Sequence, residues 1–440
     1  MDAERPRRTR EIIANKEKML LMQRFVIALI LGTVGILASG YAAKDSKIVE
    51  WTRFRGPNGT GHGQAKGLPV KWNDSDLIWK VKLPGVGHSS PVLWGNRVFS
   101  TCADEGDGSQ YVLRHDALTG EEIWQKKFNS EKYPHHKFNS FASATPCVDG
   151  AQLYVSWTTK HSNDLLCLDH DGNLLWRRDF GRYETQHGNG FSPIVYQEFV
   201  VLTHDHHAKS SIIALDRKTG ETRWQTTRNS AKPSSSTPCF YKPEDGALQF
   251  VSNSMAHGCY GVDAKTGKVL WETGSETLDL RSVSSPFFAG GRFFASCGAG
   301  GRGSRFAAVI PPKSGRGEPK IAYSFRKSIP YVPTPIAKEN LLFFVTDGGI
   351  ASCHDLASGD LKWRERLEGN YFASPILVDG VIYAVSREGN VVTFEASESF
   401  KIKGQSKLGE LTYNTPAVAN DSIYFRTYSH LIRISGSPEK

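Results

Sequence analysis

From about residue 45 onward, the chain alternates short apolar runs with polar turns. Residues 198–203, 211–216 and 221–227 (EFVVLT, SIIALD and ETRWQTT) are typical of these runs, which Gly, Asp or Lys-Thr-Gly turns separate. No stretch after residue 45 has a convincing helical period. The pattern therefore predicts a protein built from short β-strands.

Two markers recur along this series of strands. The first is Ser or Thr before Pro, and it occurs eight times, at Ser90, Thr145, Ser192, Thr237, Ser285, Thr334, Ser374 and Thr415. The second is an aromatic residue that closes each unit, at Trp79, Trp124, Trp176, Trp224, Trp271, Tyr323, Trp363 and Phe400. Successive prolines are 40 to 55 residues apart, which is the spacing of four-stranded propeller blades.

The aromatic series is offset, because its first member precedes the first Ser-Pro pair. We expect the segment around Trp79 to supply the outer strand of the last blade by pairing with the strand around Ile432. Such a pairing closes the ring and removes two open sheet edges. The predicted fold class is therefore all-β, a single eight-bladed β-propeller closed by an N-terminal strand.

A specific turn precedes several of the closing aromatics. Residues 214–224 spell Ala-x-Asp-x-x-Thr-Gly-x-x-x-Trp, and near copies end at Trp124, Trp271 and Trp363. In such a turn Asp accepts backbone hydrogen bonds, and Gly takes a positive φ whose bare backbone lets an indole lie flat against it. We therefore expect structural docking between blades by Trp79, Trp124, Trp176, Trp224, Trp271 and Trp363.

One unit departs from the pattern. Between residues 286 and 335 the segment 311–317 (PPKSGRG) replaces the Asp turn, and Tyr323 stands in place of Trp. Either this blade is irregular or the count of eight is wrong by one.

The turn resembles the tryptophan-docking motif of the pyrroloquinoline-quinone-like (PQQ-like) repeat family, over residues 72–436. Ahead of it, Trp51-x-x-Phe54-Arg55-Gly56-Pro57 is similar to a segment of many exported bacterial members. The resemblance implies a leading segment at 44–71 and the propeller at 72–436. We expect Trp51 and Phe54 to pack on the propeller from outside the ring, and we leave open whether Arg55 points into its centre.

The N-terminal region has the layout of an export signal. Residues 25–43 carry no charge, follow Arg24 and end in small residues. A run of this length also suffices for an uncleaved anchor, so residues 1–43 are either a signal peptide or a signal anchor. Both alternatives predict a bacterial envelope protein on the periplasmic side, with membrane contact through this segment if it is retained.

Charge and cysteine content narrow the function classes. The 54 basic and 45 acidic residues give a net charge of +9, and the chain has no basic run or recognisable nucleic-acid module, which argues against nucleic-acid binding. The seven cysteines are odd in number and include no C-x-x-C, which argues against a zinc site or a dense disulfide framework.

The segments before the prolines are rich in polar and aromatic residues. In a propeller these connections emerge on one face around the axis, together with the turns between second and third strands. Such convergence is what a binding site requires, although polar residues at a pore mouth also simply solvate the opening. The residues expected on this funnel face are His88, Asn139, His187, Asn189, Arg281, Tyr331, Tyr371 and Asn414; no catalytic residue is predicted.

Two further motifs contain residues that can bind a metal or a nucleotide. His204 and His206 lie at a predicted hairpin tip, and with His187 as a third ligand they are weak candidates for a metal site. We favour an exposed polar turn, so no metal is expected. Residues 298–303 match G-x-G-x-x-G, but a strand-like run follows them and no helix does, which predicts a flexible loop and no dinucleotide site.

Two functions remain open. The resemblance implies a non-catalytic cell-envelope propeller that acts as a protein-interaction or ligand-binding scaffold. It would be similar to the BamB-type subunit of the outer-membrane assembly machinery, whose lipidated Cys this chain lacks. We then expect a monomer with an envelope protein or peptide partner and no cofactor. The alternative is a PQQ-dependent alcohol dehydrogenase holding PQQ and calcium in the funnel. The vicinal Cys-Cys pair of such enzymes is missing and no clear calcium-ligand set is found, so we favour the first function.

Overall fold

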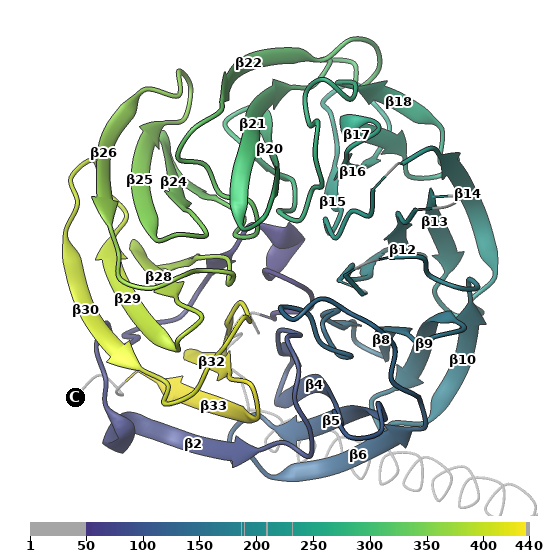
Figure 1. Ribbon diagram of the computed structural model, residues 1–440, viewed down its shortest axis with the longest axis vertical. Coiled ribbons are helices and arrows are strands. Elements are labelled where there is room, and N and C mark those ends of the chain that lie inside the picture. The colour runs from purple at the N-terminus through teal and green to yellow at the C-terminus, as the bar shows by residue number, and fades with distance from the viewer. Residues whose placement is uncertain (1–49, 186, 189, 208–209, 231, 437–440) are drawn as a thin grey trace, which may run out of the picture. The chain divides into compact units, whose positions relative to one another are not determined.

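The computed structural model describes residues 50–436, apart from 186, 189, 208, 209 and 231. In this part of the chain eight β-sheets surround one central axis (Figure 1). The predicted all-β, eight-bladed propeller is therefore confirmed. Among the described residues no helix is long and apolar enough to cross a membrane. The predicted signal region lies outside the described residues.

The blades follow one another along the chain, and each begins with its innermost strand. Blade 1 consists of β3 (Val92–Trp94), β4 (Arg97–Ala103), β5 (Gln110–Asp116) and β6 (Glu122–Phe128), and blade 2 of β7 (Cys147–Val148), β8 (Gln152–Thr158), β9 (Asn163–Asp169) and β10 (Leu174–Asp179). Blade 3 consists of β11 (Ile194–Tyr196), β12 (Phe199–His204), β13 (Ser210–Asp216) and β14 (Thr222–Arg228), and blade 4 of β15 (Cys239–Tyr241), β16 (Gln249–Ser254), β17 (Gly258–Asp263) and β18 (Val269–Glu272).

Blades 5 to 8 complete the ring. Blade 5 consists of β19 (Phe287–Ala289), β20 (Arg292–Ala299), β21 (Arg302–Ile310) and β22 (Lys320–Phe325), and blade 6 of β23 (Ile336–Lys338), β24 (Leu341–Val345), β25 (Ile350–Asp355) and β26 (Leu361–Arg366). Blade 7 consists of β27 (Ile376–Val378), β28 (Val381–Val385), β29 (Asn390–Glu395) and β30 (Ile402–Lys407), with β1 (His62–Gly63) added to β27. Blade 8 consists of β31 (Ala417–Ala419), β32 (Ser422–Arg426), β33 (His430–Ser435) and β2 (Leu77–Lys82). Two short 3₁₀ helices, η1 (Pro57–Gly59) and η2 (Asp74–Asp76), precede β2.

The ring closes through β2. This strand runs antiparallel to β33, with Trp79 opposite Arg433 and Lys80 opposite Ile432. Figure 1 shows the purple strand β2 beside the yellow strand β33, the two ends of the propeller chain. The predicted pairing of the segments around Trp79 and Ile432 is confirmed.

Burial follows position within a blade. The middle strands β12 and β13 of blade 3 are buried along their whole length, whereas the outer strand β14 alternates exposed and buried residues. A strand covered on both faces reads as a continuous apolar run, and the middle strands are covered by the two neighbouring blades. The hydrophobic clusters accordingly bridge adjacent sheets: Ile194 and Trp224 of blade 3 pack with Phe250 and Tyr260 of blade 4.

Each docking aromatic lies against the turn of the following blade. The indole N–H groups donate to carbonyl oxygens in those turns, from Trp79 to Ala117 at 3.2 Å, Trp124 to His170 at 3.0 Å, Trp176 to Arg217 at 3.0 Å, Trp224 to Ala264 at 2.9 Å and Trp363 to Ser397 at 3.0 Å. The turn glycine has to be bare, since a Cβ on Gly220 would lie 2.7 Å from the Trp176 ring. The docking motif thus joins one blade to the next.

The unit between residues 286 and 335 still forms a four-stranded blade, with an added register shift between Cys297 and Gly298. The Tyr323 hydroxyl donates to the Leu356 carbonyl oxygen at 2.9 Å, so tyrosine reaches the same kind of acceptor as the indoles. The preceding blade adapts to the missing Asp turn: Trp271 donates to Gln249 Oε1 at 2.7 Å, and Gln249 Nε2 donates to the Gly315 carbonyl at 2.7 Å. The Gln249 side chain therefore bridges Trp271 to the altered turn.

The Ser/Thr-Pro marker has its own role at the centre of the ring. The backbone N–H of one marker residue donates to the hydroxyl of the marker in the next blade. This bond is 3.0 Å from Ser90 to Thr145, Thr145 to Ser192, Thr237 to Ser285, Ser285 to Thr334, Thr334 to Ser374 and Ser374 to Thr415. All these marker residues are buried. The following proline needs no donor because it begins an inner edge strand.

The leading segment does not pack outside the ring as expected; it crosses the central channel. Its contacts fall on the innermost strands of several blades: Leu93 N donates to Trp51 O at 2.9 Å, Val148 N to Thr52 O at 2.8 Å, Asn58 and Phe240 exchange two bonds of 2.9 Å, and β1 runs parallel to β27. Figure 1 shows η1 and β1 in purple at the centre of the ring.

This crossing segment is tightly fitted. Trp51 is fully buried, and a Cβ on Gly56, whose φ is +65°, would lie 2.5 Å from the Trp51 ring. Arg53 and Arg55 are also buried and donate to the carbonyl oxygens of Pro238 and, at 2.9 Å, Pro335. These carbonyls belong to Thr-Pro markers, so the arginines bind edge groups that the neighbouring strands leave unpaired.

Candidate binding funnel

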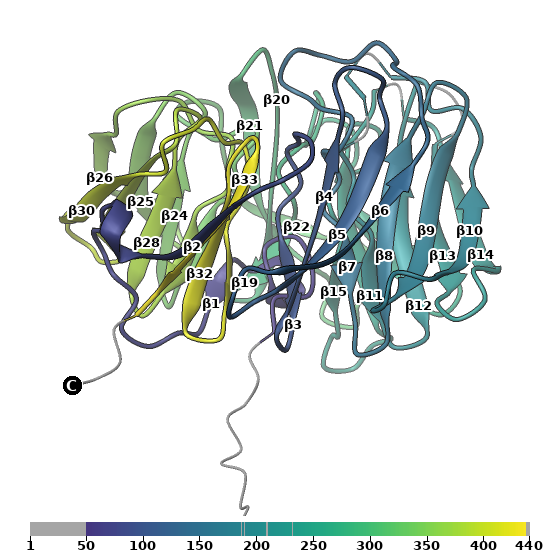
Figure 2. The same cartoon turned by 90° about the horizontal axis from the view of Figure 1, so that it is seen from below.

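A cavity of about 1050 Å³ lies on the axis of the ring. We call it the funnel. All eight connections that lead into the innermost strands contribute lining residues, and so do the strand-two to strand-three turns of blades 5, 6 and 7. Phe54 of the leading segment and the marker hydroxyls of Ser90, Thr145 and Thr237 also line it. Through Phe54 the leading segment therefore forms the floor of the funnel, and the loops form its wall. Figure 2 shows β1 of this segment in the lower half of the ring and the turn between β20 and β21 at its upper edge.

The funnel wall is basic. Among the described residues, the charged side chains that line it are Arg281, Arg302, Arg366, Arg387 and Asp347. The leading segment adds two buried guanidinium groups, Arg53 and Arg55, and burial together with the charge of Arg53 lowers the pKa of Arg55 to about 9. At neutral pH this environment favours an anionic ligand over a cationic one.

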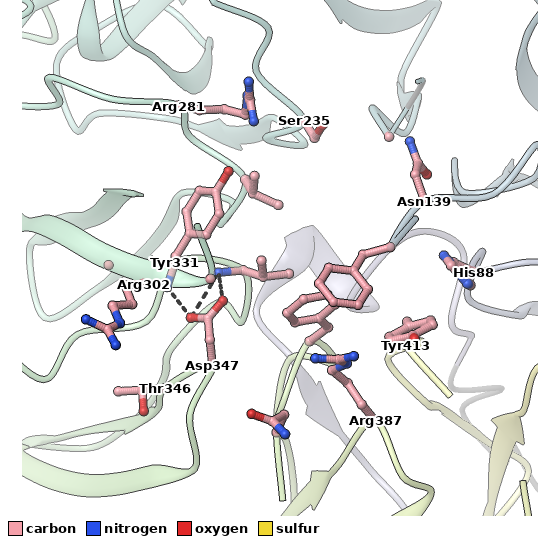
Figure 3. A pocket seen from close by; sticks show the side chains of 18 of the residues that line it. His88, Asn139, Ser235, Arg281, Arg302, Tyr331, Thr346, Asp347, Arg387 and Tyr413 are labelled. Carbon is pink, nitrogen blue, oxygen red and sulfur yellow. Dashed lines mark hydrogen bonds between the residues drawn. The ribbon is translucent and has the colours of Figure 1, made fainter. Parts of the chain in front are cut away.

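On one side of the funnel an arginine is enclosed by aromatic rings. Arg387 lies in the turn between β28 and β29, and its guanidinium carbon is 4.2 Å from the Phe138 ring centroid, 4.8 Å from that of Phe372 and 5.4 Å from that of Tyr413. These three rings come from three different connections. Figure 3 shows Arg387 near Tyr413, with His88 beside it. Such cation–π contacts hold the guanidinium in place.

In the equivalent turn of the neighbouring blade 6, Asp347 organises the backbone around Tyr331. Its carboxylate accepts hydrogen bonds from the N–H groups of Tyr331 at 2.7 Å and of Val332 at 3.2 Å (Figure 3). Burial raises the pKa of Asp347 to about 7, although these backbone donors oppose the shift. The carboxyl group is therefore partly protonated near neutral pH, which reduces the negative charge in the funnel further.

The histidines of the wall are neutral at physiological pH. Burial lowers the pKa of His88 to about 3 and that of His187 to about 4, with nearby Arg426 and Arg281 acting in the same direction. The rings of His136 and His187 are 5.0 Å apart. These side chains therefore offer neutral hydrogen-bonding groups and aromatic surface.

The expected funnel residues are distributed unevenly. His88, Asn139, His187, Arg281 and Tyr331 line the cavity. In contrast, Tyr371 is fully buried, where its hydroxyl donates to Glu368 O at 2.9 Å, and Asn414 is buried with its amide donating to Ser89 O at 3.0 Å. These two side chains hold connections in place and do not face the cavity. Asn189 lies outside the described residues.

The histidine pair at 204 and 206 is not on an exposed turn. Both side chains are buried, with ring centroids 4.6 Å apart, and both pack on Tyr183. Asp205 between them pairs with buried Arg228 at 2.6 Å. The expectation of an exposed turn is wrong, because the segment folds inward to meet Arg228. In the described part of the chain no three His, Cys, Asp or Glu side chains are grouped as metal ligands.

The comparisons with known proteins fit this geometry. A family model described as "Outer membrane protein assembly factor BamB" matches residues 108–365 and 326–427. The chain belongs to the BamB family of PQQ-like propellers. Outer membrane protein assembly factor BamB of Burkholderia pseudomallei (strain K96243) is 22% identical over 365 residues, which cover 80% of this chain and 86% of that protein.

Solved structures share the fold of this BamB-family propeller at low identity. BamB from Moraxella catarrhalis has a TM-score of 0.58 and 12% identity, covering 83% of this chain and 98% of that one. A europium-containing methanol dehydrogenase has a TM-score of 0.65 and 11% identity (86% and 90% covered), and quinohemoprotein alcohol dehydrogenase from Comamonas testosteroni has 0.64 and 12% (90% and 83% covered). At such identities the likeness shows the fold alone.

The donor set of the funnel does not fit a calcium-bound quinone. Calcium takes six to eight oxygen ligands, several of them carboxylates. Among the residues that the structure describes, the lining of this BamB-family funnel offers one carboxylate, Asp347, whose oxygens already accept bonds from Tyr331 and Val332.

Sequence reasoning missed several lining residues. Phe54, Phe138, Asp347, Phe372 and Arg387 all face the cavity. Asp347 and Arg387 follow the second strand of blades 6 and 7, in the turns 346–349 (TDGG) and 386–389 (SREG). Their equivalent position in two successive repeats was the signal that could have found them. Phe138 and Phe372 are next in sequence to Asn139 and Tyr371, which are among the expected funnel residues.

Proposed function

We propose that this BamB-family chain is a non-catalytic propeller of the bacterial cell envelope that binds a segment of a partner protein in its funnel. The observation that carries the proposal is the convergence of all eight connections on one floored cavity of about 1050 Å³, with Arg387 and aromatic rings on its wall. Aromatic residues and arginine are the side chains that most often dominate protein contacts. The family match supports the envelope location and a role beside other proteins.

In-cell crosslinking tests this proposal. A photoreactive residue at Phe372, in the funnel, is expected to capture a specific partner. The matched control is Lys265, which is exposed in a docking turn and lies outside the funnel lining. Capture from position 265 alone would contradict the proposal, because the working surface would then lie elsewhere.

The proposal includes the absence of a redox cofactor. Its support is that the described lining of the funnel holds a single carboxylate, Asp347, which already accepts backbone hydrogen bonds. Purified protein titrated with PQQ and Ca²⁺ is expected to show no stoichiometric quinone absorbance and no dye-linked alcohol oxidation. Stoichiometric binding with turnover would replace the scaffold function with that of an alcohol dehydrogenase.

A further inference from the structure

Arg387 is surrounded by aromatic rings, whereas several other arginines of the propeller are paired with a carboxylate. Asp205 neutralises Arg228, and Asp164 binds Arg177 at 2.8 Å. The ion pairs found in the described part of the chain include none with Arg387. Its Nε–H is buried and has no hydrogen-bond partner among those residues. The guanidinium is therefore held by rings without a counter-ion.

Phe138, Phe372 and Tyr413 form an aromatic bracket around Arg387 that leaves its terminal N–H groups available, in contrast to the buried Nε–H. A guanidinium is planar, and its N–H groups point outward in that plane, so contacts with rings leave the in-plane donors free for a planar acceptor. Phe138 and Phe372 lie 5.4 Å apart, and Phe372 and Tyr413 lie 5.6 Å apart, so the bracket is itself a packed unit. An arginine immobilised in this way loses little further freedom when it binds a ligand.

The acceptor that fits these donors is a carboxylate. Paired N–H groups match the two oxygens of a carboxylate, and such charge-assisted bonds are stronger than neutral ones. Arg281, Arg302 and Arg366 line the same cavity, while Asp347, the one acidic side chain among the described lining residues, accepts hydrogen bonds from backbone N–H groups. No described acidic side chain forms an ion pair with Arg387.

The wall next to Arg387 also favours apolar groups on the ligand. Phe138, Phe372 and Tyr413 surround it, and Phe54, Val283 and Ile329 line other parts of the funnel. The volume of about 1050 Å³ lies at the upper end for small-molecule sites, so the funnel has room for several residues of an extended chain.

We propose that Arg387 is a carboxylate receptor that binds an acidic side chain flanked by aromatic residues in a partner peptide. This inference rests on the proposed function, since it names the chemistry of the segment that enters the funnel. It makes Arg387 the specificity-determining residue of the site.

Matched peptides test the inference. Binding of acetyl-Gly-Phe-Asp-Phe-Gly-amide to the full chain is measured by calorimetry beside the same peptide with Asn in place of Asp. The Asp peptide is expected to bind at least about tenfold more tightly, as a charge-assisted hydrogen bond implies. Arg387→Met is expected to abolish this difference. Arg364→Met removes the same charge from an exposed position on β26 and should preserve it.

Further arms separate the alternatives. Arg387→Lys keeps the charge without the planar fork, so most of the discrimination should still be lost; this variant carries the test if Arg387→Met fails to fold. Benzoate titrated alone distinguishes a small carboxylate from a peptide, and its binding with the same Arg387 dependence in place of the peptide would overturn the peptide assignment.

Two results would overturn the receptor role. One is equal affinity of the wild-type protein for the Asp and Asn peptides, and the other is unchanged discrimination by Arg387→Met. If position 372 still captures a partner in cells in either case, the proposed function stands and the role of Arg387 does not.

Discussion

At the scale of single residues, the buried position of Asp347 in the funnel changes the charge of its carboxyl group. Its carboxylate fixes the backbone of Tyr331 and Val332, yet burial raises its pKa to about 7. An aspartate in an unfolded chain titrates near 3.9. Between these values the folded protein binds a proton that the unfolded chain has released.

Stability should therefore depend on Asp347 in a defined direction. Its contribution is fully present below about pH 4 and is lost as the pH rises through about 7. Relative to Asp347→Asn, the wild-type protein should lose unfolding free energy between pH 5 and pH 8, measured by urea unfolding. The buried histidines, His88 and His204, act in the opposite direction but equally in both proteins. A constant difference between the two proteins across this range would contradict the expectation.

The marker hydroxyls give a second expectation at this scale. Ser285→Ala leaves the buried Thr237 N–H without its acceptor, and an unsatisfied buried donor costs about 1–3 kcal/mol. Ser314→Ala, at an exposed turn position, should change the free energy of unfolding by less than about 0.5 kcal/mol. Equal unfolding midpoints for the two variants would show that the hydrogen bond to the Ser285 marker hydroxyl does not stabilise the propeller.

Single residues are also where sequence reasoning was weakest. Tyr371 and His88 belong to similar polar connections, yet one is buried against its own backbone and the other lines the funnel. The direction of a side chain in an irregular connection depends on contacts that no periodicity encodes. His204 and His206 are buried for the same kind of reason, because Asp205 between them meets Arg228.

At the scale of elements, the leading segment behaves as part of the core. Trp51 is fully buried, and Trp224 is 8% exposed between blades 3 and 4. Trp51→Ala and Trp224→Ala should therefore each cost on the order of 3–5 kcal/mol, the range of large-to-small core changes, measured by chemical denaturation. A cost below about 1 kcal/mol for Trp51→Ala would mean that the segment only lies on the propeller.

Repeated elements were more predictable than single ones. Eight Ser/Thr-Pro markers and the offset aromatic series sufficed to predict eight blades and the pairing of Trp79 with the last strand, because each repeat constrains the same packing between blades. The prediction of eight blades holds even where Tyr323 replaces the tryptophan, since its hydroxyl reaches the carbonyl acceptor that an indole would use. The leading segment has no repeat to compare with, and its path through the channel could not be predicted.

At the scale of the whole molecule, closure depends on one pair of strands. Lys82 of β2 lies opposite His430 of β33. The double variant Lys82→Cys with His430→Cys should form a disulfide under mild oxidation and stabilise the ring by roughly 2–4 kcal/mol, while either single variant should not. The seven native cysteines are buried and unpaired, so they should not compete. Two reactive thiols that never join would contradict the closure.

This closure also imposes an order in time. The two strands that seal the ring are roughly 350 residues apart in the chain, and at about 5–20 residues per second the ribosome needs roughly 20–70 s to make that stretch. A β2 strand formed before β33 has been made has an open edge and no partner, although the turn that accepts the Trp79 indole lies only 38 residues further on. Such an edge can pair with other chains until β33 covers it.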